Sequence, residues 1–352
     1  MIEDVLSSSR AEQDLSRELA PDRFPTFAEA ALPPRPQHAL MSEMPLPLCR
    51  TFYPLGYRAE LLTNNEEVLA AAQESFGHRT YLRAGPALTI RVSMRPGSGS
   101  SSPAEPTRRQ YNHLYSLAAD AENQAVLDLH SYANFTWVTE QVVQHRLYFR
   151  NNFLEKVVYL LLGASVVTDL HAACVSKGEK GILLCGNSGA GKSTLAYGCA
   201  RAGWTYTSDD TSYLINDSAV PRVIGHAHRV RFRPAARELF PELKEYGASP
   251  RLEGKPSLEV PISELPVQST AAEAPVHFVV YLLRSSAAIP KLVPLPRGTA
   301  TKRLCAELYS AGEIRAKHSA ILETFANIPA YDLHYSDLDR GMEMLEHLTR
   351  VL

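Results

Sequence analysis

Residues 186–193 limit what this chain can fold into more than any other part of its sequence. They read Gly-Asn-Ser-Gly-Ala-Gly-Lys-Ser and match the pattern G-x-x-x-x-G-K-[ST] at every position. The apolar residues 182–185 come before the loop, and the helix-forming residues 194–202 follow it. A loop between a buried strand and a helix is the arrangement that cradles phosphate groups, so the sequence predicts an α/β fold whose mixed sheet carries a P-loop.

Each residue type in this loop suits a bound triphosphate. The glycines let backbone N–H groups curl around phosphate oxygens, Lys192 adds a positive charge, and the Ser193 hydroxyl can bind Mg²⁺. We therefore expect ATP and Mg²⁺ as ligands. The expected contacts are Gly186, Asn187, Ser188, Gly189, Ala190, Gly191, Lys192, Ser193 and Thr194. An ordinary glycine-rich turn that caps a helix is the alternative, but it has no need of Lys192 and Ser193 together.

Two adjacent acidic residues, Asp209 and Asp210, follow the next predicted strand, residues 204–208. A second strand of a βαβ unit returns to the same sheet, which would bring both carboxylates beside the phosphates. Adjacent strand residues point to opposite faces, so one of the pair is expected to face the nucleotide. The other would orient it or reach the metal, which makes Asp209 a candidate metal ligand with Ser193. The alternative is a plain turn into a hairpin over residues 211–216.

A histidine is predicted on the other side of the loop. The strands at residues 170–175 and 181–185 flank a polar stretch of hairpin length, and pairing Ser176 with Gly181 places His171 across from Gly186. A histidine there could donate to a phosphate or to an aspartate, or could be an ordinary polar residue whose hydrogen bonds are satisfied.

Over residues 170–213 the chain resembles the C-terminal catalytic domain of HPr kinase/phosphorylase, which has a phosphoenolpyruvate-carboxykinase-like nucleotide-binding fold. The resemblance rests on His171, residues 186–193, Gly203 and the Asp209-Asp210 pair, which match in identity and order. It implies an ATP- and Mg-dependent serine kinase of a protein or peptide. Because HPr enzymes assemble as hexamers, it also admits a homo-oligomer.

The resemblance implies roles for individual residues. Asp210 would take the proton from the acceptor serine hydroxyl, His171 would assist at the phosphates, and Ser193 would bind Mg²⁺. Thr194 stands where HPr enzymes usually have Glu, and their second conserved segment, with its metal-binding Glu, is not found after Asp210. These differences argue against HPr itself as the acceptor. Some relatives act on peptide precursors, which supplies a candidate class.

Four arginines are further candidates. Arg229, Arg231 and Arg233 alternate along a predicted strand and would share one face, which suits a phosphate or an anionic substrate, or else a solvated strand face. Arg284 ends the apolar strand at residues 276–283, where a cation could complement the transferring phosphoryl group. The alternating Tyr331, Leu333 and Tyr335 are most simply core or sheet-face residues.

The 352 residues exceed what one core usually fills, so we expect more than one folding unit. Residues 1–45 predict a Ser- and Pro-rich disordered tail, residues 46–150 a smaller α+β domain with a mobile loop at 95–109, and residues 151–352 the catalytic domain. In the smaller domain we expect strands at 57–62 and 87–94 and a helix at 66–76. The catalytic domain should also contain helices at 192–202, 299–310, 314–326 and 338–348, and strands at 212–215 and 330–335.

Charge and cysteine content exclude several classes of protein. Thirty-six basic and 38 acidic side chains give a formal charge of −2, which provides no electrostatic footprint for a nucleic acid. We therefore expect no nucleic acid as partner. No apolar stretch reaches membrane-spanning length, so no membrane is expected as partner either, and a cytoplasmic location is the default. The five widely spaced cysteines indicate reduced core thiols rather than disulfides or a metal site.

Other functions are compatible with the same residues. A regulatory module could bind ATP without transferring phosphate, a small-molecule hydroxyl could replace the protein serine, and a mechanical NTPase is a third class. The regulatory module and the kinase differ at Asp210, because a sensor tolerates the loss of this carboxylate and a kinase does not. Both need Lys192.

Overall fold

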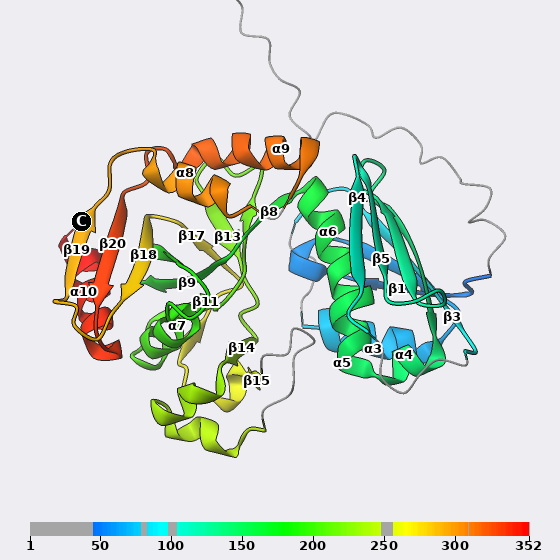
Figure 1. Ribbon diagram of the computed structural model, residues 1–352, viewed down its shortest axis with the longest axis horizontal. Coiled ribbons are helices and arrows are strands. Elements are labelled where there is room, and N and C mark those ends of the chain that lie inside the picture. The colour runs from blue at the N-terminus through cyan, green and yellow to red at the C-terminus, as the bar shows by residue number, and fades with distance from the viewer. Residues whose placement is uncertain (1–44, 79–82, 98–103, 248–255, 309, 352) are drawn as a thin grey trace, which may run out of the picture. The chain divides into compact units, whose positions relative to one another are not determined.

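The computed structural model describes residues 45–78, 83–97, 104–247, 256–308 and 310–351. The predicted tail lies outside these residues apart from Pro45, and so does part of the predicted loop at 95–109. Residues 107–109 of that loop instead begin a strand. Within the described residues the chain is a mixed α/β protein built on several sheets (Figure 1).

The first seven-stranded sheet is mixed and has the order β1-β2-β3-β7-β6-β5-β4. Its strands are β1 (Leu48–Phe52), β2 (Ala59–Thr63), β3 (Leu88–Arg95), β4 (Thr107–Tyr111), β5 (Leu114–Ala118), β6 (Gln124–Asp128) and β7 (Ala133–Thr139). The sequence predicted β2 and β3 to within two residues but missed the antiparallel run from β4 to β7.

Helices pack on this sheet through a shared apolar core. They are α3 (Glu66–Phe76), α4 (Glu140–Gln144), α5 (Arg146–Phe149), the π-helical turn η2 (Arg150–Leu154) and α6 (Glu155–Ser165). The helix predicted at 66–76 is confirmed, and it begins there because the Asn65 side chain accepts a hydrogen bond from the Glu67 N–H. Figure 1 shows α6 alongside the sheet.

The second seven-stranded sheet, β16-β11-β9-β10-β18-β20-β19, carries the glycine-rich loop. Its strands are β9 (Ala172–Lys177), β10 (Lys180–Cys185), β11 (Thr205–Ser208), β16 (Ser269–Thr270), β18 (Phe278–Arg284), β19 (Lys291–Pro294) and β20 (Ala330–Tyr335). β10, β18 and β20 are parallel, so their carboxyl ends meet at one edge. β9 and β10 form the predicted hairpin, and Ser176 pairs with Gly181 as expected.

Two smaller sheets complete the described strands. β17 (Glu273–Pro275), β13 (Arg222–Ile224), β12 (Ser212–Ile215) and β8 (Val167–Leu170) form a four-stranded antiparallel sheet, and β14 (Arg229–Phe232) pairs with β15 (Leu258–Pro261). The strand predicted at residues 170–175 is wrong in one respect. The chain breaks at His171, because β8 belongs to one sheet and β9 to another.

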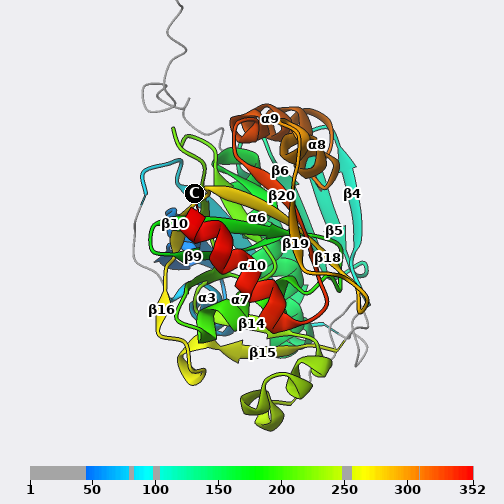
Figure 2. The same ribbon diagram turned by 90° about the vertical axis from the view of Figure 1, so that its left-hand side faces the viewer.

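Helices cover both faces of the second sheet. α7 (Lys192–Arg201) and α10 (Leu338–Val351) lie side by side on one face, together with β14 and β15 (Figure 2). α8 (Thr299–Ala306), α9 (Gly312–Leu322) and the four-stranded sheet cover the other. The predicted helices at 192–202 and 338–348 are confirmed, whereas those at 299–310 and 314–326 end earlier than expected. The second of these gives way to the 3₁₀ turn η6 (Glu323–Phe325).

The structure can be compared with the predictions on cysteines and on apolar stretches. Cys174, Cys185 and Cys199 are buried free thiols, but Cys49 is exposed and Cys305 half-buried, so the prediction of core thiols holds for only three of the five. Among the described residues, no helix is both long and apolar enough to span a bilayer. The division into a smaller domain and a catalytic domain at residue 150 stays a prediction.

Candidate functional site

The loop at residues 186–193 joins the end of β10 to the start of α7, as the sequence predicted. Gly186, Gly189 and Gly191 all have positive φ, and Asn187, Ser188 and Gly189 are exposed. As in any α-helix, the first N–H groups of α7 have no partner within the helix, and no side chain caps them. The loop therefore presents backbone donors to solvent at a helix N-terminus, where negative charge is stabilised.

Gly191 shows why this loop needs glycine. Its φ is +100°, and a Cβ there would lie 2.5 Å from the hydroxyl oxygen of Tyr335. That hydroxyl donates to the Ala190 carbonyl at 2.6 Å. The end of β20 therefore supports the loop from below, so Tyr335 has a role beyond the sheet-face packing predicted from its alternation.

Lys192 lies under the loop and is buried, with 5% of the residue exposed. Its ammonium group donates to the Gly186 carbonyl at 2.7 Å and lies 3.0 Å from Nε2 of His171. Burial lowers the pKa of Lys192, while Asp210, Glu307 and Asp209 act in the opposite direction.

His171 lies between Lys192 and Asp210. Its Nδ1 is 3.6 Å from Oδ1 of Asp210. Burial lowers the pKa of His171, and Lys192 lowers it further against the opposing charges of Asp210 and Glu307. Because an ammonium group can only donate, Nε2 is the acceptor, which assigns the proton of a neutral imidazole to Nδ1, on the side of Asp210.

Asp209 is buried, with 6% exposed, and its carboxylate is held by hydrogen bonds from β11 and β14. Its Oδ2 accepts from the Arg231 backbone N–H at 2.9 Å, and its Oδ1 accepts from the Tyr206 hydroxyl at 3.2 Å. The Asp209 carbonyl accepts from Ser193 Oγ at 3.3 Å. Burial and the neighbouring charge of Asp210 raise the pKa of Asp209 to about 6, although Arg231 and Tyr206 lower it.

β11 ends in an irregularity just before the two acidic residues. The register against β9 shifts between Tyr206 and Ser208, so Thr207 is an extra residue, and the strand has ended before Asp209. Bulges re-aim the side chains that follow them and are common beside functional sites. Asp209 and Asp210 thus lie in a bend between two sheets, with the Asp209 backbone carbonyl beside Ser193 and the Asp210 carboxylate beside His171.

The structure therefore brings three of the predicted segments together: the imidazole of His171, the loop at residues 186–193, and the Asp209-Asp210 pair. Arg284, at the end of β18, lies at the same sheet edge and is exposed. It pairs in register with Tyr335, the residue under the loop.

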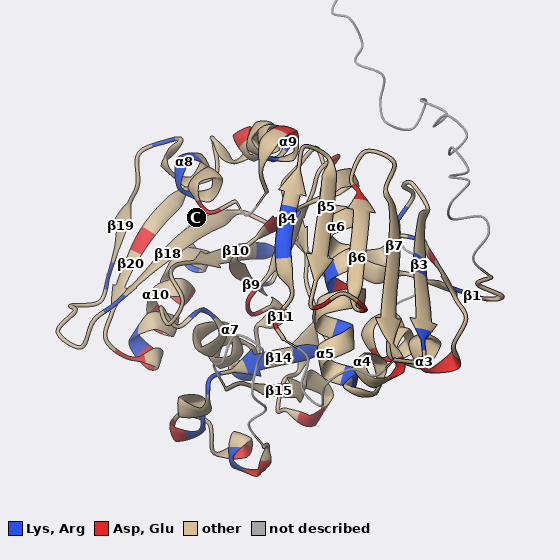
Figure 3. Ribbon diagram, turned by 45° about the vertical axis from the view of Figure 1, so that its right-hand side comes forward, with Lys and Arg blue, Asp and Glu red and all other residues tan. Residues whose placement is uncertain are grey.

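The arginines of β14 are not open to an anion as predicted. Arg229 is buried and ion-paired with Glu155 and Glu259, and Arg231 is also paired with Glu259. Figure 3 shows the basic residues along this strand. The carboxylates could not be assigned from sequence because Glu155 and Arg229 are 74 positions apart. Only Arg233, just after the strand, is exposed.

Glu307, which follows α8, was missed by the sequence analysis. Its charge acts on both His171 and Lys192 and opposes the lowering of their pKa values by burial. Nothing in the local sequence marks it, since α8 comes from a part of the chain that no motif connects to the loop. Tyr335 was also missed as a site residue, but it had a signal: it ends a strand parallel to β10 and so reaches the edge where the loop begins.

The residues present fit ATP and Mg²⁺ by their chemistry. The loop offers backbone donors and a lysine for phosphate, and Ser193, Asp209 and Asp210 offer the oxygen ligands that Mg²⁺ prefers. Among the described residues, no group of three or more His, Cys, Asp or Glu side chains could hold a metal ion. In phosphoryl-transfer sites Mg²⁺ takes one or two carboxylates and completes its shell with phosphate oxygens and water.

A distant structural match is found among the solved structures that resemble this chain. No protein-family model matches the sequence, and no curated protein matches it. The structure of the Hpr(Ser) kinase/phosphatase from Coxiella burnetii is similar to 52% of this chain and to 93% of its own chain, at 12% identity and a TM-score of 0.27. The similarity is weak, and it establishes neither the family nor an activity.

Proposed function

We propose that this protein is an ATP- and Mg-dependent kinase that transfers the γ-phosphoryl group to a hydroxyl. The observation that carries the proposal is the position of His171, whose two ring nitrogens face Lys192 under the loop and the carboxylate of Asp210. A phosphate-binding lysine and a carboxylate that can accept a proton are the two groups that phosphoryl transfer to an alcohol needs at close range.

Each site residue has its own role in the proposed phosphoryl transfer. The loop N–H groups and Lys192 hold the triphosphate, and Asp210 accepts the proton of the acceptor hydroxyl. As that O–H bond breaks, the hydroxyl oxygen forms a bond to the γ-phosphorus, and the bond from that phosphorus to the β,γ-bridging oxygen breaks to release ADP. The neutral imidazole of His171 directs its Nδ1–H toward Asp210, whose carboxylate oxygen lies 3.6 Å away.

Mg²⁺, when bound, neutralises charge on the β- and γ-phosphates. Ser193 Oγ and a carboxylate of the Asp209-Asp210 pair are the ligands that the chain offers it. A protein or peptide serine as the acceptor rests on the sequence resemblance alone, and a small-molecule hydroxyl uses the same chemistry.

The test measures nucleotide binding and phosphoryl transfer separately. Purified protein is given Mg²⁺ and γ-labelled ATP with cell extracts and with small hydroxyl compounds, and ATP affinity is measured by calorimetry. We expect Lys192→Ala to lose ATP binding, and Asp210→Asn to keep binding but lose transfer by about a hundredfold or more, because general base catalysis contributes that much. Asp217→Asn, in an exposed turn, is the matched control and should behave as wild type.

Two outcomes contradict the proposal. If wild-type protein binds ATP but labels no acceptor, and Asp210→Asn leaves cellular phosphorylation unchanged, the protein is a nucleotide sensor. If wild-type protein does not bind ATP, the loop is a structural turn and both functions are lost.

A further inference from the structure

The position of Asp209 depends on β14. The carboxylate accepts a hydrogen bond from the backbone N–H of Arg231, the third residue of that strand. The single proton of the Tyr206 hydroxyl is shared between Asp209 Oδ1, at 3.2 Å, and the carbonyl of Arg229 on the same strand, at 2.9 Å. A displacement of β14 would therefore move both partners of the Asp209 carboxylate.

Backbone hydrogen bonds alone hold β14 weakly. It pairs with β15 and with no other described strand, over the four residue pairs from Arg229 with Pro261 to Phe232 with Leu258. Two-stranded sheets are marginal on their own and need packing or side-chain anchors. The apolar residues Val230 and Phe232 supply packing on one face.

Side-chain anchors hold the other face. Arg229 is 9% exposed and donates through its two terminal nitrogens to Glu155, at 3.3 Å, and to Glu259, at 3.1 Å. Glu259, on β15, also accepts from Arg231 Nε at 2.7 Å. Burial alone would raise the pKa of Glu259, but Arg231 and Arg229 outweigh it and hold that pKa at about 2.

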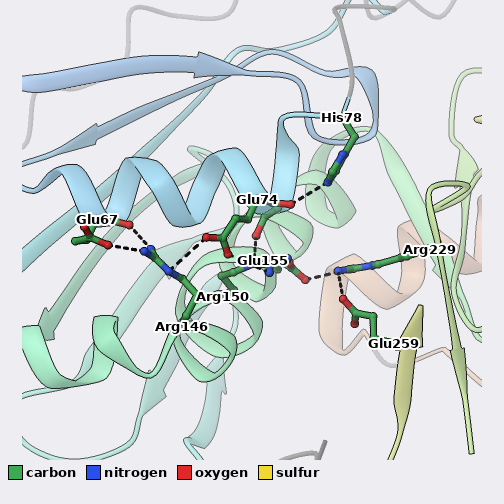
Figure 4. Close-up of polar contacts among 9 residues, drawn as sticks. Glu67, Glu74, His78, Arg146, Arg150, Glu155, Arg229 and Glu259 are labelled. Atoms are coloured by element: carbon green, nitrogen blue, oxygen red, sulfur yellow. Dashed lines mark hydrogen bonds and ion pairs between the residues drawn. The ribbon is translucent and has the colours of Figure 1, made fainter. Parts of the chain in front are cut away.

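Glu155 ties this anchor to another part of the chain (Figure 4). It is the first residue of α6 and 5% exposed, and its second oxygen accepts from Arg150 at 3.2 Å. Arg150 donates in turn to Ser75 at 2.8 Å and to Glu74 at 3.3 Å, both on α3. Alternating charges thus run without interruption from α3 through Arg150, Glu155 and Arg229 to β14.

The charged form of Glu155 is maintained in this position. Burial on its own would raise the pKa of Glu155, but Arg229, Arg150 and Arg231 outweigh it, so the pKa is lowered. A carboxylate that is buried, ionised and shared between two arginines from different elements fixes the distance between those elements.

We propose that Glu155 is a positioning residue: through Arg229 it holds β14 in the place where the Arg231 N–H and the Tyr206 hydroxyl fix the carboxylate of Asp209. The effect of Glu155 on catalysis rests on the proposed kinase function. The effect of Glu155 on the position of β14 does not depend on that function. The same bridge joins α3 to β14.

The first test is Glu155→Gln, which keeps the shape of the side chain and removes its charge. Hydrogen exchange of the Arg231 amide measures the hold on β14, and steady-state kinetics measure phosphoryl transfer. We expect the Arg231 amide to exchange at least about tenfold faster while the amides of β10 keep their protection. We expect kcat to fall by about ten- to a hundredfold, since small displacements at a reacting centre have effects of that size, with the KM for ATP nearly unchanged. Glu343→Gln, which breaks an exposed ion pair with Arg340, is the control and should change neither readout.

A second variant separates positioning from packing. Glu155→Leu with Arg229→Met replaces the buried pair by apolar groups, a change that commonly preserves stability and so guards against simple unfolding. We expect this variant to remain folded, with rapid Arg231 exchange and low kcat.

The outcomes are distinguishable. If Glu155→Gln exchanges and turns over as wild type, or if the double variant restores both readouts, Glu155 acts only in packing and the proposal is overturned. If the wild-type protein transfers no phosphate but Arg231 exchange still accelerates in Glu155→Gln, the hold on β14 is supported and the kinase function is the part that fails.

Discussion

At the scale of single residues, Asp209 lies in an environment that disfavours its charge. Its carboxylate is buried and adjacent to Asp210, and these two causes raise its pKa to about 6 from the ordinary 3.8. A raised pKa means that the folded protein holds this proton more tightly than the unfolded chain. Stability is therefore lost as the pH rises from about 4 to about 6, and it stays reduced above that range.

We therefore predict that Asp209→Asn is more stable than wild type at neutral pH. The amide keeps an oxygen for the Arg231 N–H and carries no charge to bury, so a gain of about 1–3 kcal/mol is expected at about pH 7.5. The gain should shrink as the pH falls toward 4, where wild-type Asp209 is protonated as well. Urea unfolding followed at several pH values measures it. A gain of the same size at every pH, or a loss at neutral pH, contradicts the assignment of a strained carboxylate.

His171 allows its two ring nitrogens to be tested separately. The amide nitrogen of Asn can stand in for Nδ1–H, which faces Asp210, and the amide of Gln reaches the position of Nε2, which faces Lys192. If orientation of Asp210 is the main role, His171→Asn should retain more phosphoryl transfer than His171→Gln.

We expect kcat to fall about tenfold in His171→Asn and about a hundredfold in His171→Gln, within the usual range for a group that assists proton transfer. The rate of ADP formation at saturating Mg²⁺ and ATP measures both. The reverse order of the two variants would mean that the contact with Lys192 is the important one.

At the scale of elements, the support of the loop by β20 makes a prediction about glycine. Gly191→Ala forces a side chain into a conformation with φ of +100° and brings Cβ to 2.5 Å from the Tyr335 hydroxyl. We expect ATP affinity to fall by about tenfold or more, because the loop must shift away from Tyr335, and stability to fall by about 1–3 kcal/mol.

Gly178 provides the matched control. It lies in the β9–β10 turn, has a φ of +57°, and a Cβ there would meet nothing within 4 Å. Gly178→Ala should cost about 1 kcal/mol of stability through its backbone alone and leave ATP affinity unchanged. Calorimetric titration and urea unfolding compare the two variants. Equal affinities in the two would show that Tyr335 does not shape the loop.

The elements that the sequence predicted well are those set by local rules. The β9–β10 hairpin and the pairing of Ser176 with Gly181 follow from a short polar turn, and α3 follows from its Asn65 cap. The loop, His171 and both aspartates were placed because they lie in one continuous stretch whose strand, loop and helix order fixes their meeting point. The break at His171 was missed because all the other residues of 170–175 are apolar, so a periodicity of two could not show that two sheets share them.

Long-range partners could not be predicted in the same way. Glu155 and Arg229 each have ordinary local sequences, and only the fold reveals that they meet. The arginines of β14 have the alternation that suits an exposed anion site, and two distant carboxylates reverse that interpretation. Glu307 could not be predicted for the same reason, since it follows a helix late in the chain and its charge acts on His171. A single sequence contains no signal for such pairs.

At the scale of the whole molecule, the apolar core crosses the predicted boundary at residue 150. The cluster that begins with Phe52 on β1 includes Tyr213, Ile215 and Ile224, which belong to the four-stranded sheet. α6 contributes Val157 and Leu161 to the same core. We therefore expect residues 45–352 to unfold in one cooperative step rather than as two independent domains.

The two tryptophans of the chain can test this, because each reports on a different sheet. Trp137 is on β7 beside Phe135, and Trp204 precedes β11 near the ammonium group of Lys177. Single-tryptophan proteins made by Trp204→Phe and Trp137→Phe should each show one urea transition.

Ile224→Ala truncates a side chain of β13 that lies in the core of the first sheet. It should lower the stability reported by both probes equally, by about 2–5 kcal/mol. If only the Trp204 signal shifts, the first sheet folds independently of β13, and the charged bridge from α3 to β14 would then join two separately stable parts.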